Sequence, residues 1–102
     1  MIRHIVIFEF AKEAEGKTAY ENAKIAKEIL LDLKNKIDVI RRIEVGINDQ
    51  AADEKNATLC LTCDFDNFDD LNTYIKHPEH IKVGSFIGKV RISRSCVDYT
   101  ID

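Results

Sequence analysis

The order of hydrophobic periodicities along the chain constrains its fold more than any other feature. Residues 2–10 alternate as a β-strand does, and residues 18–34 carry an apolar stripe at steps of three and four, as an amphipathic helix does. A second helical region lies at 67–86, and three further segments read as strands: 40–47, 57–65 and 90–101. The order is therefore strand, helix, strand, strand, helix, strand. Two split βαβ units of this kind predict an α+β fold, βαββαβ, with a four-stranded antiparallel sheet and the helices on one face.

Residues that cap helices support these boundaries. Thr18 with Glu21 fits a capping box, in which the two side chains satisfy each other's free backbone donors. Asn67 suits the start of the second helical region. Pro78 interrupts that region but suits the first turn of a new helix, so we expect His77 to cap a further piece that runs to about residue 86.

Size and composition predict one cytoplasmic domain. The 102 residues fit a single domain, residues 1–102, and a content of 45% hydrophobic and 32% charged residues is that of a globular protein. A net charge of −3 argues against a nucleic acid or an anionic membrane as partner. No apolar run approaches the roughly 20 residues of a membrane span, and the start lacks the pattern of a secretory signal. Three cysteines do not make a disulfide scaffold, which favours a reducing compartment.

The sheet face away from the helices carries apolar side chains that need cover. The candidates lie among Thr58, Cys60 and Thr62 and are Ile5, Ile7, Val97, Tyr99 and Ile101. A second copy of the same sheet, related by a two-fold axis, would cover them. We therefore predict a homodimer through the sheet faces; a monomer with a half-polar sheet is the alternative. In the last strand the apolar phase switches between Ile92 and Val97, which indicates a β-bulge or a change of partner surface.

The segment from Tyr74 to His80 holds the most informative chemistry. His80, one turn into the second helical piece, can point back at the sheet, where His4 shares a face with Val6 and Phe8. A neutral imidazole is the usual general base near pH 7, and the Tyr74 phenol can donate a hydrogen bond. Asp98 on the last strand could hold a ring nitrogen and set the tautomer. The alternative is that these histidines are core residues satisfied by the backbone, and that His77 is a helix cap whose ring meets water or backbone.

The other motifs of the chain give weaker indications of function. A metal held by His77, Glu79, His80 and His4 would use a spacing that matches no recognised zinc site, so we expect no metal. Cys60 and Cys63 are three apart on a strand and point to opposite faces, which is unsuited to redox chemistry. The chain has no phosphate-binding glycine loop. Two arginine pairs could bind an anion, although pairs this small are usually solvated: Arg41 with Arg42, and Arg91 with Arg94.

Four segments of the chain resemble a known family. They are residues 3–8, 45–48, 74–80 with its HPxH stretch, and 97–99, and they are similar in order and spacing to the stress-responsive A/B barrel domain (Dabb) family over nearly the whole chain. The resemblance implies a ferredoxin-like fold that pairs as a dimeric α/β-barrel. A plant branch of polyketide cyclases with the same motif works without metal or organic cofactor. There the second histidine of the motif is the base and the upstream tyrosine its partner, which implies His80 and Tyr74 here, with His4 as the histidine of the opening strand.

The chain departs from that branch at the cavity wall. Leu59 stands where the plant cyclases carry a histidine, and Ala23, Ala26 and Leu30 stand in a helix that is more aromatic there. The base could therefore be kept while the cavity differs, and a shared fold does not transfer a reaction.

Two functional hypotheses follow. The first is an enzyme without cofactor, a cyclase, isomerase or lyase acting on a small, polyketide-like carbonyl compound. His80 would be the base, Tyr74 would donate to the enolate, and Asp98 or a nearby carbonyl would orient His80. The expected substrate-binding residues are Val6, Phe8, Leu30, Leu59, His77 and Ile92. The alternative is a non-catalytic, stress-related homodimer that binds a small molecule or protects. A haem- or metal-handling relative is a third reading, which absorbance or metal in the purified protein would reveal.

Overall fold

The computed structural model describes residues 1–102 and confirms the expected order of elements, with one added hairpin. The chain forms β1 (Ile2–Phe10), β2 (Glu13–Ala14), β3 (Lys17–Thr18), α1 (Ala19–Lys36), β4 (Arg42–Ile47), β5 (Leu59–Phe65), α2 (Phe68–Lys76), α3 (Pro78–Val90) and β6 (Arg91–Thr100). The second helical region is thus two helices, as the proline at its centre predicts, and α3 runs to Val90 rather than to Phe86.

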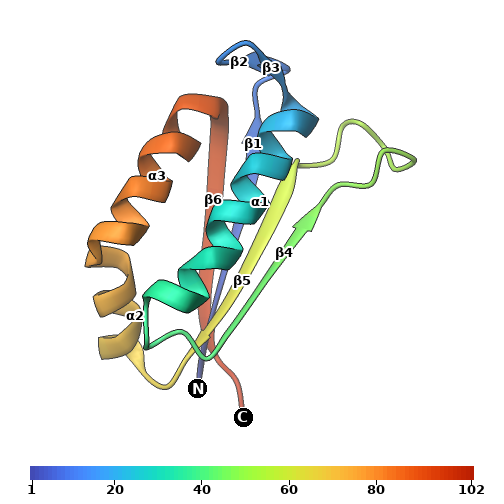
Figure 1. Ribbon diagram of the computed structural model, residues 1–102. Helices are drawn as coiled ribbons and strands as arrows, with labels where there is room; N and C mark the ends of the chain where they lie inside the picture. The colour runs from blue at the N-terminus through green and yellow to red at the C-terminus, as the bar shows by residue number, and fades with distance from the viewer.

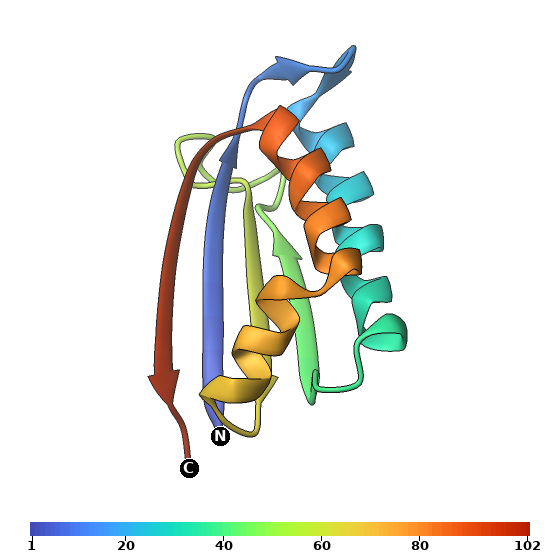
Figure 2. The same ribbon diagram turned by 90° about the vertical axis from the view of Figure 1, so that its left-hand side faces the viewer.

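The main sheet has the ferredoxin-like arrangement. Its strand order is β4-β5-β1-β6, and the three neighbouring pairs are antiparallel. All three helices lie on one face of this sheet (Figures 1 and 2). The two termini lie close together (Figure 1), where the Ile101 amide donates to the Met1 carbonyl oxygen at 2.9 Å. The α+β class, the four strands and the single helical face were all predicted, and all are confirmed.

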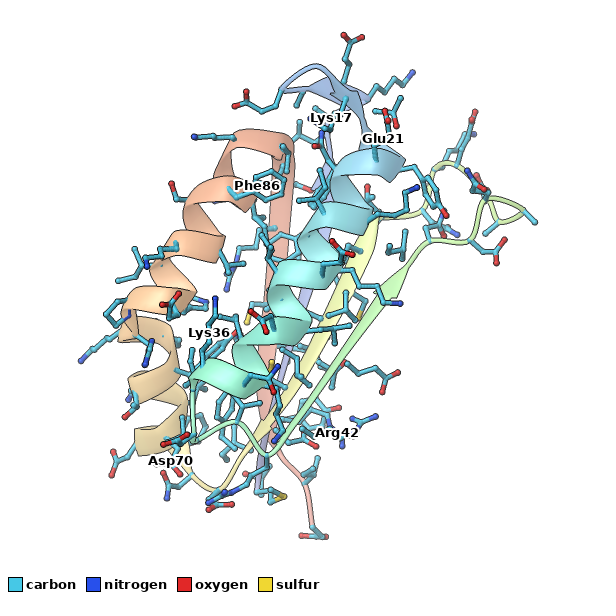
Figure 3. All side chains as sticks on the ribbon, in the orientation of Figure 1. Lys17, Glu21, Lys36, Arg42, Asp70 and Phe86 are labelled. Atoms are coloured by element: carbon cyan, nitrogen blue, oxygen red, sulfur yellow. The ribbon has the colours of Figure 1, made fainter.

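The core lies between the helices and the sheet. Along β1 the even-numbered residues are buried on the helical side, while Ile5 is half-buried and Ile7 exposed on the other side. From α1, the residues Ala23, Ala26, Leu30 and Leu33 are buried against them. Burying a leucine side chain contributes about 1.5–3 kcal/mol, so this stripe fixes which face of α1 meets the sheet. Phe86 points from α3 toward α1 and packs, partly buried, against the core (Figure 3).

The predicted caps are confirmed. Thr18 and Glu21 form both hydrogen bonds of a capping box, and the Asn67 side chain accepts from the backbone of the first turn of α2. His77 ends α2, where its backbone amide donates to the Tyr74 carbonyl oxygen, and it starts α3, where its ring Nδ1 accepts from the Glu79 amide at 3.1 Å. His77 is therefore the helix cap that the alternative interpretation described.

Three local features differ from the sequence prediction. The hairpin of β2 and β3 turns through Glu15 and Gly16, which both have positive φ (51° and 74°), as a tight primed turn requires. Its strands are too short for a periodic signal. The sequence also places Phe68, Leu71, Tyr74 and Ile75 at helical spacing, which predicts one buried stripe, but Phe68 and Ile75 are 53% and 41% exposed.

A β-bulge in β6 sets which side chains face the helices. Glu9 pairs with Ser93 but Phe10 pairs with Arg91, so Ile92 is an extra residue in the ladder. The predicted phase change is confirmed. Ile92 is 63% exposed, and its expected place in the wall of a substrate cavity is wrong.

The residues after the bulge fall in register with the buried face of β1. Phe8, Val6 and His4 pair in turn with Arg94, Cys96 and Asp98. Paired residues point to the same side of a sheet, so the three side chains of β6 share the helical face. On the opposite, open face, Ile7, Val97 and Tyr99 are exposed. None of the helices is long and apolar enough to cross a membrane.

Candidate active site

A small cavity lies between the sheet, α2 and α3. Its volume is about 130 Å³. The apolar wall consists of Val6, Phe8, Leu30, Leu61, Val83 and Ile87, with the Gly84 backbone beside them. The polar side chains that reach it are His4, Tyr74, His80, Arg91 and Arg94. Three of the four side chains proposed for catalysis from the sequence therefore line one cavity, from β1, α2 and α3.

His80 is oriented by the break between the two helices. In an unbroken helix the Ile75 carbonyl would accept from the Glu79 amide, but that amide donates to His77 instead. The Ile75 carbonyl accepts from the ring of His80, with Nδ1 and the oxygen 3.0 Å apart. A carbonyl cannot donate, so Nδ1 carries the proton and Nε2 keeps its lone pair. His80 is thus held by a backbone carbonyl, one of the two partners that the sequence left open.

The environment of His80 keeps its ring neutral. Burial lowers its pKa first, and electrostatic repulsion by Arg94, and by His4 and His77 when they are protonated, lowers it further, while the bond to Ile75 works in the opposite direction. The net pKa lies below the usual 6.5. A neutral imidazole with a free Nε2 at an apolar cavity has the protonation state that a general base needs.

Tyr74 is fully buried between the two histidines. Its ring centroid lies 4.5 Å from that of His80 and 6.1 Å from that of His4. The phenol oxygen has the Cys63 thiol as a weak contact at 4.0 Å. Burial raises the Tyr74 pKa, and it raises that of Cys63 to about 12, so both groups stay protonated at neutral pH. Tyr74 is therefore a neutral hydrogen-bond donor in the lining of the cavity.

Asp98 orients His4 rather than His80. The two residues are paired across β1 and β6, and Nδ1 of His4 lies 2.5 Å from Oδ1 of Asp98. The carboxylate can only accept, so Nδ1 of the buried His4 carries the proton and donates it to Asp98. This bond does not involve Nε2, the other ring nitrogen. Of the two partners that the sequence left open for His80, Asp98 is therefore not the one observed, because the bulge in β6 sets Asp98 opposite His4.

One group of side chains has the composition of a metal site. His4 Nδ1, Cys96 Sγ and Asp98 Oδ1 lie within 4.8 Å of one another. Two ligand atoms bound to one tetrahedral ion at about 2.0–2.2 Å would lie roughly 3.3–3.6 Å apart, farther than the 2.5 Å between His4 and Asp98. A metal would have to separate these atoms and replace the proton between them. The expected absence of a metal remains a prediction.

Three residues expected to bind substrate do not line the cavity. His77 caps α3, Ile92 is exposed at the bulge, and Leu59 is buried in the core while Leu61 takes the place on the wall. The sequence indicated that Arg91 and Arg94 could bind an anion but are more often solvated, and it did not assign them to the cavity, which both of them line. The phase change in β6 was the signal that could have identified them.

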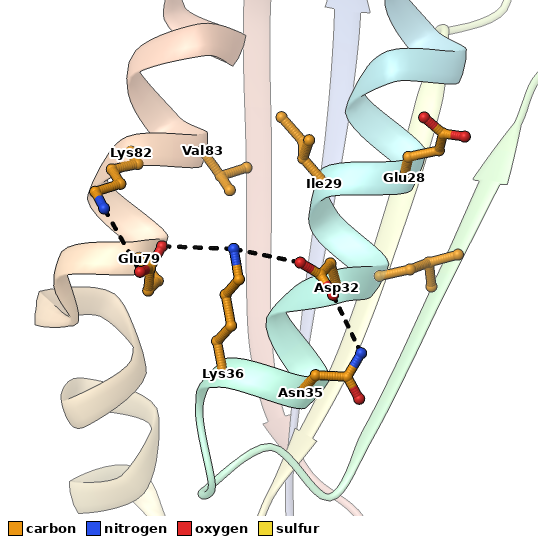
Figure 4. Close-up of a pocket in the computed structure, with 9 residues that line it drawn as sticks. Glu28, Ile29, Asp32, Asn35, Lys36, Glu79, Lys82 and Val83 are labelled. Carbon is orange, nitrogen blue, oxygen red and sulfur yellow. Dashed lines mark hydrogen bonds and ion pairs between the residues drawn. The ribbon is translucent and has the colours of Figure 1, made fainter.

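A larger hollow between α1 and α3 has a different character. It measures about 760 Å³ and contains charged side chains that neutralise one another (Figure 4). Lys36 lies between Asp32 at 3.3 Å and Glu79 at 3.8 Å, and Lys82 contacts Glu79 at 3.5 Å. Such exposed pairs contribute little to stability, and the hollow contains no histidine or tyrosine. The cavity beside His80 is the better candidate site.

Comparison with known proteins identifies relatives of the whole chain. The family model described as Stress responsive A/B Barrel Domain matches residues 2–101. A dimeric protein of unknown function with a ferredoxin-like fold, from Bacteroides fragilis, is 35% identical with a TM-score of 0.86, over 98% of this chain and 95% of that one. None of the curated proteins compared with the chain matches it.

More distant solved structures share the fold. A dimeric ferredoxin-like protein of unknown function from Thermobifida fusca is 22% identical, with a TM-score of 0.81 over 98% of this chain and 90% of that one. The hydroxynitrile lyase of Passiflora edulis is 12% identical, with a TM-score of 0.80 over 99% of this chain and 93% of that one. At these identities the likeness is one of fold.

Proposed function

The chain belongs to the stress responsive A/B barrel domain family, and we propose that it is an enzyme that removes a proton next to the carbonyl of a small molecule, with His80 as the base. One observation carries this proposal. The Ile75 carbonyl holds the protonated Nδ1 of His80, so the free Nε2 belongs to a half-buried ring that lines an apolar cavity.

The proposed step uses two side chains of the cavity. Nε2 of His80 takes a proton from the carbon beside the carbonyl, the C–H electron pair forms the carbon–carbon double bond of an enolate, and the carbonyl oxygen gains the negative charge. The Tyr74 hydroxyl donates a hydrogen bond to that oxygen. In its weak contact with Cys63, at 4.0 Å, the phenol oxygen accepts from the thiol, so the hydroxyl proton remains available to donate. Return of the proton, ring closure or bond cleavage would complete an isomerase, cyclase or lyase reaction.

The comparison with a lyase agrees with small-molecule chemistry on this fold. The Passiflora edulis protein is named as a hydroxynitrile lyase. Its 12% identity transfers the fold and not the reaction, so the proposal depends on the geometry of His80. Chemistry without a cofactor remains part of the proposal.

His80→Asn tests the role of the base. Asparagine can still donate to the Ile75 carbonyl but has no basic nitrogen. The measurement is the exchange of the α hydrogens of 3-oxobutanamide for deuterium, followed by proton NMR above the protein-free rate. Loss of a general base should slow the exchange by about 10²–10⁴-fold. His77→Asn, on the helix cap outside the cavity, is the matched control and should retain the rate. A folded His80→Asn variant that exchanges at the wild-type rate would refute the proposal.

A second candidate function is binding without chemistry. It is favoured by the complete burial of Tyr74 and by the hydrogen bonds that already satisfy one nitrogen of His4 and one of His80. In that case 3-oxobutanamide would bind without any exchange in the wild-type protein. The same NMR experiment therefore separates the two functions.

We also propose that the chain forms a homodimer through the open face of its sheet. Ile7, Val97 and Tyr99 are 42%, 54% and 41% exposed on that face, and the relatives from Bacteroides fragilis and Thermobifida fusca are described as dimeric. Exposed apolar side chains in one patch favour a protein partner. A cytoplasmic location and the lack of nucleic-acid or membrane partners remain predictions from composition.

A further inference from the structure

The arginines of the chain fall into two groups. There are five, and three of them pair with carboxylates: Arg3 with Asp64, Arg41 with Asp66, and Arg42 with Glu44. Arg91 and Arg94 take part in none of the eight ion pairs of the structure. Both of these unpaired guanidinium groups line the same cavity as His80. Among the arginines, only these two are thus left without an ion pair, and both lie at the same cavity.

The bulge in β6 is what brings the two arginines together. Residues three apart on a regular strand point to opposite faces of the sheet. Because Ile92 is an extra residue, Arg91 pairs with Phe10 and Arg94 with Phe8, and both partners are buried on the helical side. The two guanidinium groups therefore share one face. A bulge that redirects side chains in this way is often found beside an active site.

The carboxylates near the arginines are already engaged or point elsewhere. Asp98, on the same face of β6, accepts from His4. Glu9 pairs with Ser93 and is exposed on the opposite face. The wall of the cavity is otherwise apolar or aromatic. A ligand that brings its own negative charge would supply what this cavity lacks.

We propose that Arg91 and Arg94 form an anion subsite on the exposed side of the His80 cavity, and that the cavity takes a small keto acid by its carboxylate. A guanidinium matches a planar carboxylate with two parallel N–H donors. The carbonyl and the α carbon of the acid would lie toward Tyr74 and His80. This inference depends on the proposed function for its reactive end, while the subsite itself depends only on the two arginines.

The test compares two probes that differ in charge, 3-oxobutanoate and 3-oxobutanamide. Their dissociation constants are measured by NMR titration of the intact protein. The wild type should bind the carboxylate more tightly than the amide. Arg91→Gln and Arg94→Gln should each weaken carboxylate binding by about tenfold or more, since a hydrogen bond to a charged group contributes about 1.5–3 kcal/mol. Binding of the amide should be unchanged, and lysine at either position should restore part of the affinity.

A control and a second probe complete the experiment. Arg41→Gln removes an arginine of the surface and should leave both affinities unchanged. Carboxylate affinity that is unchanged in both cavity variants would overturn the subsite, even where His80 is still needed for exchange. If the wild type shows no exchange above the protein-free rate but its carboxylate binding depends on the two arginines, the proposed function would be overturned and the subsite would stand. Inorganic phosphate that binds more tightly than the carboxylate would overturn the assignment to a keto acid.

Discussion

The two glycines of α3 offer a matched pair of substitutions that separate stability from function. Gly84 and Gly88 both lie within the helix Pro78–Val90, and a Cβ atom added at either meets no atom within 4 Å. Glycine is less favourable than alanine in a helix interior by about 0.8–1.0 kcal/mol, mostly because the unfolded chain has more freedom. Each alanine variant should therefore gain up to about 1 kcal/mol in free energy of unfolding, or about 4–8 °C in Tm for a domain of this size.

Only one of the two positions touches the cavity. Gly84 lines it and Gly88 does not. Gly84→Ala places a methyl group at the wall of a cavity of only about 130 Å³ and should weaken binding of 3-oxobutanamide. Gly84→Leu should weaken it further. Gly88→Ala should leave binding and exchange at the wild-type level.

Thermal unfolding and NMR titration together test this reasoning. Unfolding must be followed at one protein concentration for all variants, because the Tm of a dimer depends on concentration. A loss of stability in either alanine variant would refute the geometry at that glycine. Equal ligand affinity in the wild type and Gly84→Leu would refute the cavity as the binding site.

Four further predictions concern His80, the open sheet face and the capping box of α1. Since burial lowers the pKa of His80, its neutral form is favoured in the folded state, so the acid limb of the exchange rate should have its midpoint below pH 6.5, and pH–rate profiles measure it. The same shift contributes stability that is present above pH 6.5 and is lost as the pH falls toward the lower folded-state pKa, a slope that His80→Asn should remove in urea titrations. Val97→Asp places a charge on the open sheet face and should convert the dimer to a monomer by analytical ultracentrifugation; a wild type that is already monomeric would contradict the sheet-face dimer. Thr18→Ala removes the capping box of α1 and should cost about 1 kcal/mol in urea unfolding, with Thr18→Ser as the control that retains most of the stability.

Local patterns were enough to predict the fold. The alternation along residues 2–10 and the apolar stripe of α1 show which side of each element is buried. Each such side must pack against another element, whichever element that is. The caps at Thr18, Asn67 and His77 act within a few residues of the chain, so their signals stand complete in the sequence. The hairpin at Glu15 and Gly16 was missed because two-residue strands are too short to show a period.

The site required distances between residues far apart in the chain. The sequence by itself indicated that His4, Tyr74 and His80 could meet, since His4 shares a strand face with Val6 and Phe8 and His80, one turn into its helix, can point back at the sheet. Only the tertiary structure decided that Asp98 holds His4, and that Ile75 rather than Asp98 holds His80. It likewise decided that Arg91 and Arg94 reach the same cavity. The physical reason is that a single extra residue in β6 changes the partner and the face of every side chain beyond it, and pairing between strands becomes visible only when both strands are in place.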